Sequence, residues 1–276
     1  MRARTIACGT AAVATLGLAL VATPASAADD AQLSVLHGVP DLTVDVWVDG
    51  KLTLDDFAPG DLAGPLDLPA GTYTVAITAS DAEDDSDPAI GPVDLELAAG
   101  GSYTAAAHLD ADGQPTATLF TNDVSTTAAG EGRLTVRHIA AAPAVDVLAG
   151  GDAVVSGLEN PDEAVLDLPA GTVSASVVAA GTTEPALLGP ADVDVAEGSN
   201  VIVYAWGDAT DDPSSLALAT QVIDGLHSDP TAVQAGELGL AAQDEGPAAW
   251  LWAVGALVVA AGIGTGLAAR RSTVRG

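Results

Sequence analysis

The sequence predicts an all-β protein with two tandem Ig-like β-sandwich domains, followed by one C-terminal transmembrane α-helix. Apolar and polar residues alternate with a period of two through most of the central chain, which is typical of half-buried strands. A block of about 100 residues occurs twice, which indicates a duplicated domain. Continuous apolar runs of membrane-directed length occur only near the two ends, so the central part is expected to be soluble.

The first 27 residues have the pattern of a secretory signal peptide. Arg2 and Arg4 precede an apolar stretch, and the small residues at 25–27 suit signal peptidase cleavage. An uncleaved N-terminal anchor is the alternative, although the apolar stretch is short and diluted with Gly and Thr. Cys8 lies inside this segment, so the mature chain is expected to have no thiol and no disulfide.

The repeat is clearest where residues 66–72, Leu-Asp-Leu-Pro-Ala-Gly-Thr, recur unchanged at 166–172. Upstream, the Val-Asp-Val triplet at 44–46 recurs at 145–147, and a Gly-Pro pair followed by alternating apolar residues recurs downstream. Because the matching blocks occur in the same order, they indicate duplicated domains rather than short solenoid repeats.

The strand pattern and the turn residues divide the chain into segments. Val44, Val46 and Val48 alternate with Asp45 and Trp47, and turn signals separate such segments every 8 to 15 residues. About seven strands per copy indicate an Ig-like sandwich. The expected segments are a signal peptide (1–27), a first sandwich (28–125), a linker (126–132), a second sandwich (133–223) and a stalk (224–247).

The C-terminal anchor is expected at residues 248–269, an uncharged apolar run that would span about 30 Å as a helix. Trp250 and Trp252 lie near its outer end, where indoles favour the membrane interface. Three arginines follow its other end, so residues 270–276 are expected to be cytoplasmic and the preceding domains extracellular.

The acidic charge excludes one class of partner. The chain has 38 Asp and Glu against 8 Lys and Arg, a formal net charge of −30, and only Lys51, Arg133 and Arg137 are basic between Asp29 and Glu245. Nucleic-acid binding depends on basic residues that neutralise phosphates, so it is not expected here. Acidity that keeps an exposed domain soluble is the preferred interpretation, with a cationic partner or salt adaptation as alternatives.

An ordered set of motifs links the chain to a known family. The set comprises His37, Pro40, Val44, Asp45, Val46, Asp49, Gly50, residues 68–75, Ser102, Tyr103 and Thr104. It resembles the bacterial domain of unknown function family 4397, and the second copy fits more loosely because Val173 replaces a Tyr. The resemblance implies a secreted, often repeated, Ig-like or prealbumin-like module of the bacterial envelope without an established activity.

Enzymatic activity is not expected from the motifs. The sequence has no Gly-x-Ser-x-Gly elbow, no His-Glu-x-x-His zinc motif and no cysteine outside the signal peptide. The equivalent residues His37 and His138 each precede an aspartate, Asp45 or Asp146, so a pair could orient an imidazole for catalysis or metal binding. A structural role in fixing the first turn is the preferred interpretation.

The other two histidines are not interpreted as chemical groups. The repeat equivalent of His108 is Trp206, and His227 falls in the expected stalk.

Calcium is the one cofactor with a candidate site, on an acidic loop that concentrates five carboxylates: Asp81, Glu83, Asp84, Asp85 and Asp87. The loop lacks the spacing of an EF-hand, and the second copy has only Gly-Thr-Thr-Glu at 181–184. A solvated hairpin tip is the preferred interpretation. No other cofactor is expected.

The expected function is that of a membrane-anchored extracellular β-sandwich protein of the bacterial envelope, with a binding, adhesion or structural role and no catalytic activity. The partners expected are the membrane, through residues 248–269, and a cell-wall or surface-protein ligand. A calcium-stabilised envelope spacer is the alternative, and an enzyme of unrecognised type is a third. Oligomeric state stays open.

Overall fold

The computed structural model describes residues 29–211 and 214–227, and these residues form sixteen β-strands. The all-β prediction is therefore confirmed for this part of the chain. Within it, no helix is long and apolar enough to cross a membrane. The signal peptide (1–27), most of the stalk, the transmembrane helix (248–269) and the cytoplasmic tail lie outside the described residues.

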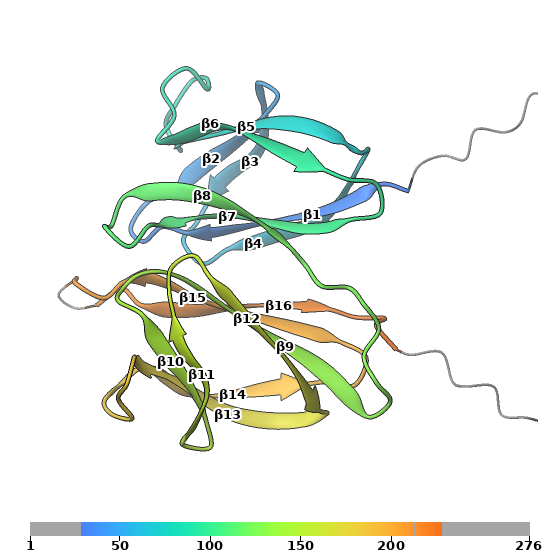
Figure 1. The fold of residues 1–276 in the computed structure, drawn as a ribbon. Coiled ribbons are helices and arrows are strands. Elements are labelled where there is room, and N and C mark those ends of the chain that lie inside the picture. The colour runs from blue at the N-terminus through green and yellow to red at the C-terminus, as the bar shows by residue number, and fades with distance from the viewer. Residues whose placement is uncertain (1–28, 212–213, 228–276) are drawn as a thin grey trace, which may run out of the picture. The chain divides into compact units, whose positions relative to one another are not determined.

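The first half of the chain forms two four-stranded sheets (Figure 1). One sheet has the order β4-β1-β7-β8 and contains β1 (Ala31–Gly38), β4 (Leu62–Leu68), β7 (Ser102–Leu109) and β8 (Pro115–Thr121). The other has the order β3-β2-β5-β6 and contains β2 (Val44–Val48), β3 (Lys51–Phe57), β5 (Gly71–Ala79) and β6 (Ile90–Leu97). The two sheets form a β-sandwich.

The second half repeats this strand order. One sheet has the order β12-β9-β15-β16 and contains β9 (Glu131–Ala141), β12 (Glu163–Pro169), β15 (Asn200–Asp208) and β16 (Ala217–Ile223). The other has the order β11-β10-β13-β14 and contains β10 (Val145–Ala149), β11 (Asp152–Leu158), β13 (Gly171–Ala179) and β14 (Ala186–Val195).

The strand number and order correct the Ig-like expectation. Each half has eight strands rather than seven, and its first strand lies between the fourth and the seventh, parallel to the seventh. An Ig constant domain instead arranges seven strands as ABED and CFG. A period of two identifies strands in a sequence, but pairing between distant strands depends on the tertiary fold.

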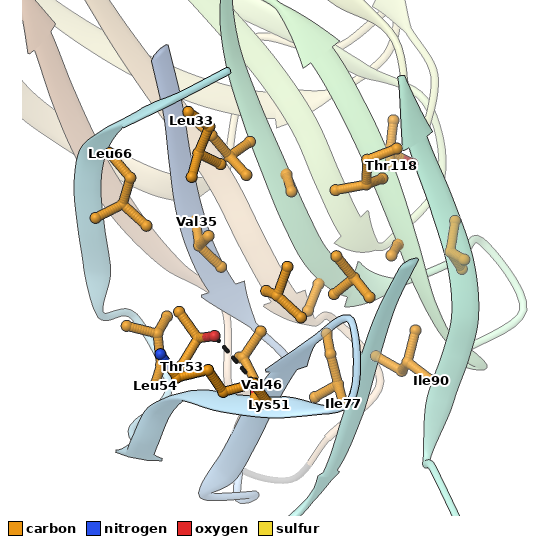
Figure 2. Close-up of a pocket in the computed structure, with 18 residues that line it drawn as sticks. Leu33, Val35, Val46, Lys51, Thr53, Leu54, Leu66, Ile77, Ile90 and Thr118 are labelled. Carbon is orange, nitrogen blue, oxygen red and sulfur yellow. Dashed lines mark hydrogen bonds between the residues drawn. The ribbon is translucent and has the colours of Figure 1, made fainter. Parts of the chain in front are cut away.

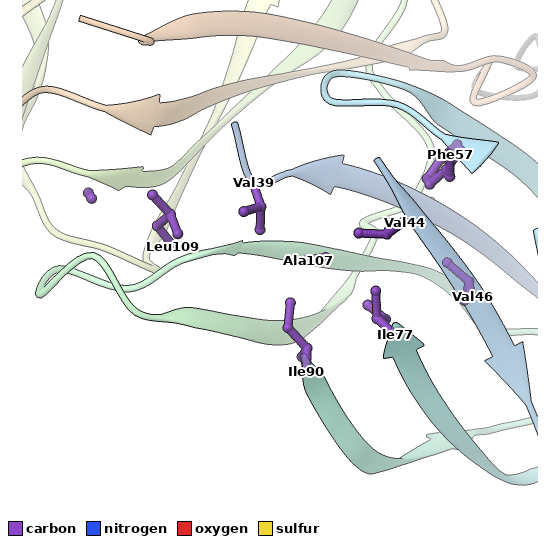
Figure 3. Packing of buried hydrophobic residues seen from close by; sticks show 9 residues of the cluster. Val39, Val44, Val46, Phe57, Ile77, Ile90, Ala107 and Leu109 are labelled. Atoms are coloured by element: carbon purple, nitrogen blue, oxygen red, sulfur yellow. The ribbon is translucent and has the colours of Figure 1, made fainter. Parts of the chain in front are cut away.

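The core of each sandwich follows the predicted alternation. Val44 and Val46 of β2 pack with Ile77 of β5, Ala107 of β7 and other buried residues between the two sheets (Figure 3). The second sandwich has its own cluster, which includes Val145 and Val147 at the equivalent positions. Each half therefore buries an apolar core of its own.

A third apolar cluster joins the two halves. It contains Leu36, Ala106 and Phe120 of the first sandwich and Ile139, Ile202, Tyr204 and Trp206 of the second. These side chains come from the sheets that contain β1 and β9, on the faces opposite the sandwich cores. The central strands β1, β7, β9 and β15 are thus buried on both faces.

Candidate functional site

The two equivalent histidines each bond the loop that follows their strand. Nε2 of His37 donates to the carbonyl oxygen of Leu42 over 2.6 Å, and Nε2 of His138 donates to that of Pro143 over 3.2 Å. Both imidazoles are buried, and burial lowers their pKa below the usual 6.5. Each therefore acts as a neutral donor that fixes the turn between the first two strands of its half.

The two equivalent aspartates bond backbone N–H groups. Asp45 Oδ1 accepts from the amide of Asp56 over 2.9 Å, and Asp146 accepts from the amides of Gly157 (2.7 Å) and Gly181 (2.8 Å). Asp56 and Gly157 have positive φ, and the β2–β3 and β10–β11 pairings are irregular along these strands. The carboxylates satisfy amides that the irregular pairing leaves free.

Burial of these aspartates corrects the expected strand pattern. The alternation puts Asp45 on the opposite face of a half-buried strand from the valines, yet Asp45 is 3% exposed and Asp146 is 6% exposed. The reason is that β2 and β10 are central strands, each bordered by an irregular edge strand whose amides the carboxylates bond.

Three carboxylates converge beside β3. Oxygens of Asp45, Asp55 and Asp56 lie within 4.8 Å of one another, and among the described residues this is the group that meets the geometry of potential metal ligands. Repulsion by Asp45, and then by Asp56, raises the pKa of the exposed Asp55. The second sandwich has Ser156 and Gly157 at the corresponding positions, so the cluster is not a shared feature of the fold.

The acidic loop lies between β5 and β6. Hydrogen bonds from Ser86 lower the pKa of Asp84, whose Oδ1 accepts the Ser86 amide over 3.0 Å. Asp85 Oδ2 lies 3.7 Å from the point where a Cβ would stand on Gly50, so the loop folds beside the β2–β3 turn. None of the five candidate carboxylates belongs to the convergent group. Calcium binding at Asp81, Glu83, Asp84, Asp85 and Asp87 stays an untested alternative to a solvated hairpin tip.

His108 and His227 also have structural partners. His108 donates through Nδ1 to the Leu109 carbonyl over 2.8 Å and accepts from Thr118 at Nε2 over 2.9 Å, and burial lowers its pKa. His227 forms a β-bridge with Thr127, so it belongs to the folded part although it falls in the segment expected to be stalk.

A buried arginine forms the centre of the contact between the two sandwiches. Arg137 of β9 donates through Nη1 to Asn122 Oδ1 (3.0 Å) and to the Tyr204 hydroxyl (2.8 Å), and through Nε to Glu163 (2.8 Å). Its guanidinium carbon also lies 4.3 Å from the ring centroid of Phe120. Asn122 and Phe120 come from the first half of the chain, so one side chain connects both halves.

The polar network extends from this arginine. The Tyr204 hydroxyl donates to Oε1 of Gln221 over 2.6 Å, and Thr104 lies 3.0 Å from the same oxygen. Gln221 in turn donates through Nε2 to Ser34 over 3.2 Å. All four residues are buried. Their hydrogen bonds orient the two inner sheets, which are the sheets that contain β1 and β9, relative to each other. This network was not predicted from the sequence, where its one signal is an arginine within the apolar strand β9.

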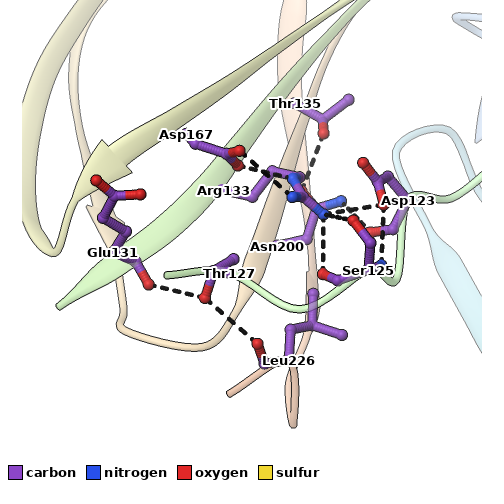
Figure 4. A network of polar contacts seen from close by, with 9 residues as sticks. All are labelled: Asp123, Ser125, Thr127, Glu131, Arg133, Thr135, Asp167, Asn200 and Leu226. Atoms are coloured by element: carbon purple, nitrogen blue, oxygen red, sulfur yellow. Dashed lines mark hydrogen bonds and ion pairs between the residues drawn. The ribbon is translucent and has the colours of Figure 1, made fainter. Parts of the chain in front are cut away.

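A second arginine holds the connection between the halves (Figure 4). Arg133 pairs with Asp123 and Asp167, each at 2.9 Å, and donates to the Ser125 carbonyl over 3.1 Å. The Thr127 amide donates to the Leu226 carbonyl over 2.8 Å. The segment expected to be a linker (126–132) therefore contains a bonded Thr127 and the start of β9.

Part of the chain matches a known protein family. Residues 31–148 match the sequence model of a family described as a domain of unknown function (DUF4397), which confirms the resemblance. The matched segment contains β1 to β8 and the following strand β9, and it extends into β10. No curated protein matches the chain.

Proposed function

We propose, on the premise that residues 31–148 contain a DUF4397 domain, that this chain is a non-catalytic envelope protein displaying two joined β-sandwiches outside the cell. The signal-peptide pattern at 1–27 and the apolar run at 248–269 support export and anchoring by a single helix. The displayed pair would serve adhesion, cell-wall contact or recognition of a surface partner.

The observation that carries this proposal is the burial of the two inner sheets against each other. Arg137 and Gln221 are 1% and 7% exposed, and both have hydrogen-bond partners in the opposite sandwich. Because charged and amide groups buried in this way require their partners, the two sandwiches would move as one body. A rigid body suits presentation of a surface at a fixed distance from the membrane.

The roles of the polar groups favour a non-catalytic protein. A general base needs an imidazole or carboxylate free to reach a substrate. His37, His138, Asp45 and Asp146 are buried and bond the backbone of their own half, which is the pattern of structural residues.

We assign the second half to the same family as a diverged copy. Its sheets have the same strand order as the first, and β9 pairs in parallel with β15 as β1 pairs with β7. Of the two fold types that the resemblance implies, eight strands in this order favour the prealbumin-like module over the Ig-like one.

Protease treatment of intact cells would test display and topology. A chain with an epitope tag after residue 276 is expected to lose its outer domains while a short tagged fragment stays protected in the cytoplasm. The matched variant ends at residue 247 and should appear in the medium. A fully protected chain, or a tag that the protease removes, would refute the proposed orientation.

Calorimetry on residues 28–228 would test the single rigid body. This segment forms one compact unit that contains both sandwich cores and the cluster joining them. One unfolding transition is expected, with a van't Hoff enthalpy equal to the calorimetric enthalpy. Two separate transitions would show that the sandwiches unfold independently.

A further inference from the structure

The first sandwich contains an apolar cavity between its two sheets (Figure 2). Its volume is about 280 Å³, and its walls include Leu33 and Val35 of β1, Val46 of β2 and Ile77 of β5. This volume lies between that of an engineered cavity that binds benzene, about 150 Å³, and the lower limit of small-molecule pockets, about 300 Å³. The space therefore suits one slender apolar group.

Comparison of the two sandwiches identifies lining positions that are smaller in the first. The equivalent space in the second sandwich measures about 30 Å³. Ala105 pairs with Val35 in the first sandwich, whereas Val203 pairs with the equivalent Val136 in the second.

The same difference occurs one strand further along the sheet. Ala117 pairs with Ala107 in the first sandwich, whereas Leu218 pairs with the equivalent Ala205 in the second. Ala105 and Ala117 line the large cavity, while Val203 and Leu218 line the small one. At these two positions the first sandwich has the smaller side chains, although its Val75 and Val93 are larger than the equivalent Ala175 and Ala191.

The cavity reaches solvent beside the edge strand β3. Lys51 and Thr53 of this strand line the cavity and are exposed, whereas its other lining residues are buried or half-buried. Leu66 of β4, the edge strand of the facing sheet, lies on the same side (Figure 2). The opening therefore combines apolar walls with one ammonium group and one hydroxyl group.

Lys51 is distinctive among the basic residues. It is the only lysine in the sequence, and Arg133 and Arg137 already pair with carboxylates. Lys51 forms no ion pair with any residue of the described part. The second sandwich has Asp152 at this position. Strand pairing shows the equivalence, because Lys51 pairs with Val48 and Asp152 pairs with Ala149, the counterpart of Val48. The cation and the hollow core therefore occur together in one sandwich and are both missing from the other.

We propose that this cavity binds a single-chain anionic amphiphile, a fatty acid or a similar acyl compound. The acyl chain would fill the apolar space, where it would replace dispersion contacts that an empty cavity lacks. The carboxylate would lie at the opening against the Lys51 ammonium, which supplies the charge complementarity. This inference does not depend on the proposed surface display.

Titration calorimetry with decanoate on residues 28–228 tests the proposal. The measurement is made in about 0.15 M salt, where screening over about 8 Å weakens repulsion by distant carboxylates. One molecule is expected to bind per chain with a micromolar dissociation constant and to raise the thermal midpoint. Decanol and decyltrimethylammonium carry the same chain with a neutral or a cationic head, and both are expected to bind more weakly than decanoate.

Two sets of variants separate the contribution of the ligand's acyl chain from that of its carboxylate head group. The double variant Ala105→Val/Ala117→Leu copies the second sandwich and is expected to weaken decanoate binding at least about tenfold by filling the cavity. Lys51→Gln is expected to weaken binding of decanoate by about two- to fivefold and to leave decanol unchanged. The single variant Ala105→Val makes a milder change at the same place and serves if the double variant unfolds.

The proposal fails if decanoate neither binds nor raises the midpoint. It also fails if binding survives unchanged in the folded cavity-filling variants, because the ligand would then lie elsewhere. Equal affinity for all three head groups would overturn the assignment of Lys51.

Discussion

Arg137 of the second sandwich donates a hydrogen bond through Nη1 to Oδ1 of Asn122, over 3.0 Å, and both side chains are buried. Asn122 directly follows β8, the last strand of the first sandwich. This bond ties the end of one sandwich to the central strand of the next.

Replacement of Arg137 should weaken the contact between the two sandwiches and lower the unfolding free energy. Arg137→Met removes the guanidinium that donates to Asn122 and to the Tyr204 hydroxyl in a buried space, so a loss of about 3 kcal/mol in unfolding free energy is expected. Urea unfolding measures it. Glu163→Gln serves as the control, since the Glu163 side chain is 34% exposed and should cost about 1 kcal/mol or less. Equal losses would contradict the central role of the arginine.

The two equivalent aspartates should differ in their contribution to stability. Asp146→Asn weakens acceptance from two backbone amides and is expected to cost about 1–2 kcal/mol. Asp45→Asn should cost less, because Asp45 bonds one amide and lies beside Asp55 and Asp56, so neutralising it relieves repulsion. Paired urea titrations compare the two variants. A larger loss for Asp45→Asn would show that repulsion in the acidic cluster is negligible.

The buried histidines predict a loss of stability in mild acid. The folded-state pKa values of His37, His108 and His138 lie below 6.5, so the unfolded chain binds protons first as the pH falls. Their contribution is complete above pH 6.5 and declines as the pH falls through that value, by at most about 1.4 kcal/mol per pH unit for each histidine.

Unfolding free energies at pH 7.5 and 5.5 measure this effect. His108→Gln removes one titrating group and should reduce the difference between the two pH values. An unchanged difference in the variant would mean that His108 does not contribute, and the fall would then have to come from other groups.

The calcium prediction for the acidic loop has a direct test. The five carboxylates at 81–87 do not belong to a convergent group, so any effect of calcium on the thermal midpoint of residues 28–228 is expected to be the same with and without them. Magnesium and sodium chloride at equal ionic strength control for general screening of the charge. A calcium-specific rise that the variant Asp84→Asn/Asp85→Asn/Asp87→Asn loses would instead establish the site.

The local pattern predicted that the central chain forms strands but not the environment of each strand. Val44 and Val46 alternate with Asp45, which correctly places the valines in the core. Burial of Asp45 could not be predicted in the same way, because it depends on an amide of the neighbouring strand β3. Burial of β15 on both faces has a clearer signal in the sequence. Residues 201–206, Val-Ile-Val-Tyr-Ala-Trp, form a short apolar run without alternation, which is typical of a strand buried on both faces.

The β-structure, strong acidity and internal duplication of the central chain could all be predicted from the sequence, because alternation, charge and repetition are properties of neighbouring or aligned residues. The buried interface around Arg137 and the cavity beside Lys51 in the first sandwich could be recognised only in three dimensions. Both features depend on side chains far apart in the chain, such as Arg137 with Tyr204 or Val35 with Ala105. Their packing is set by strand pairing and by side-chain volume in three dimensions, which a period-two pattern does not contain.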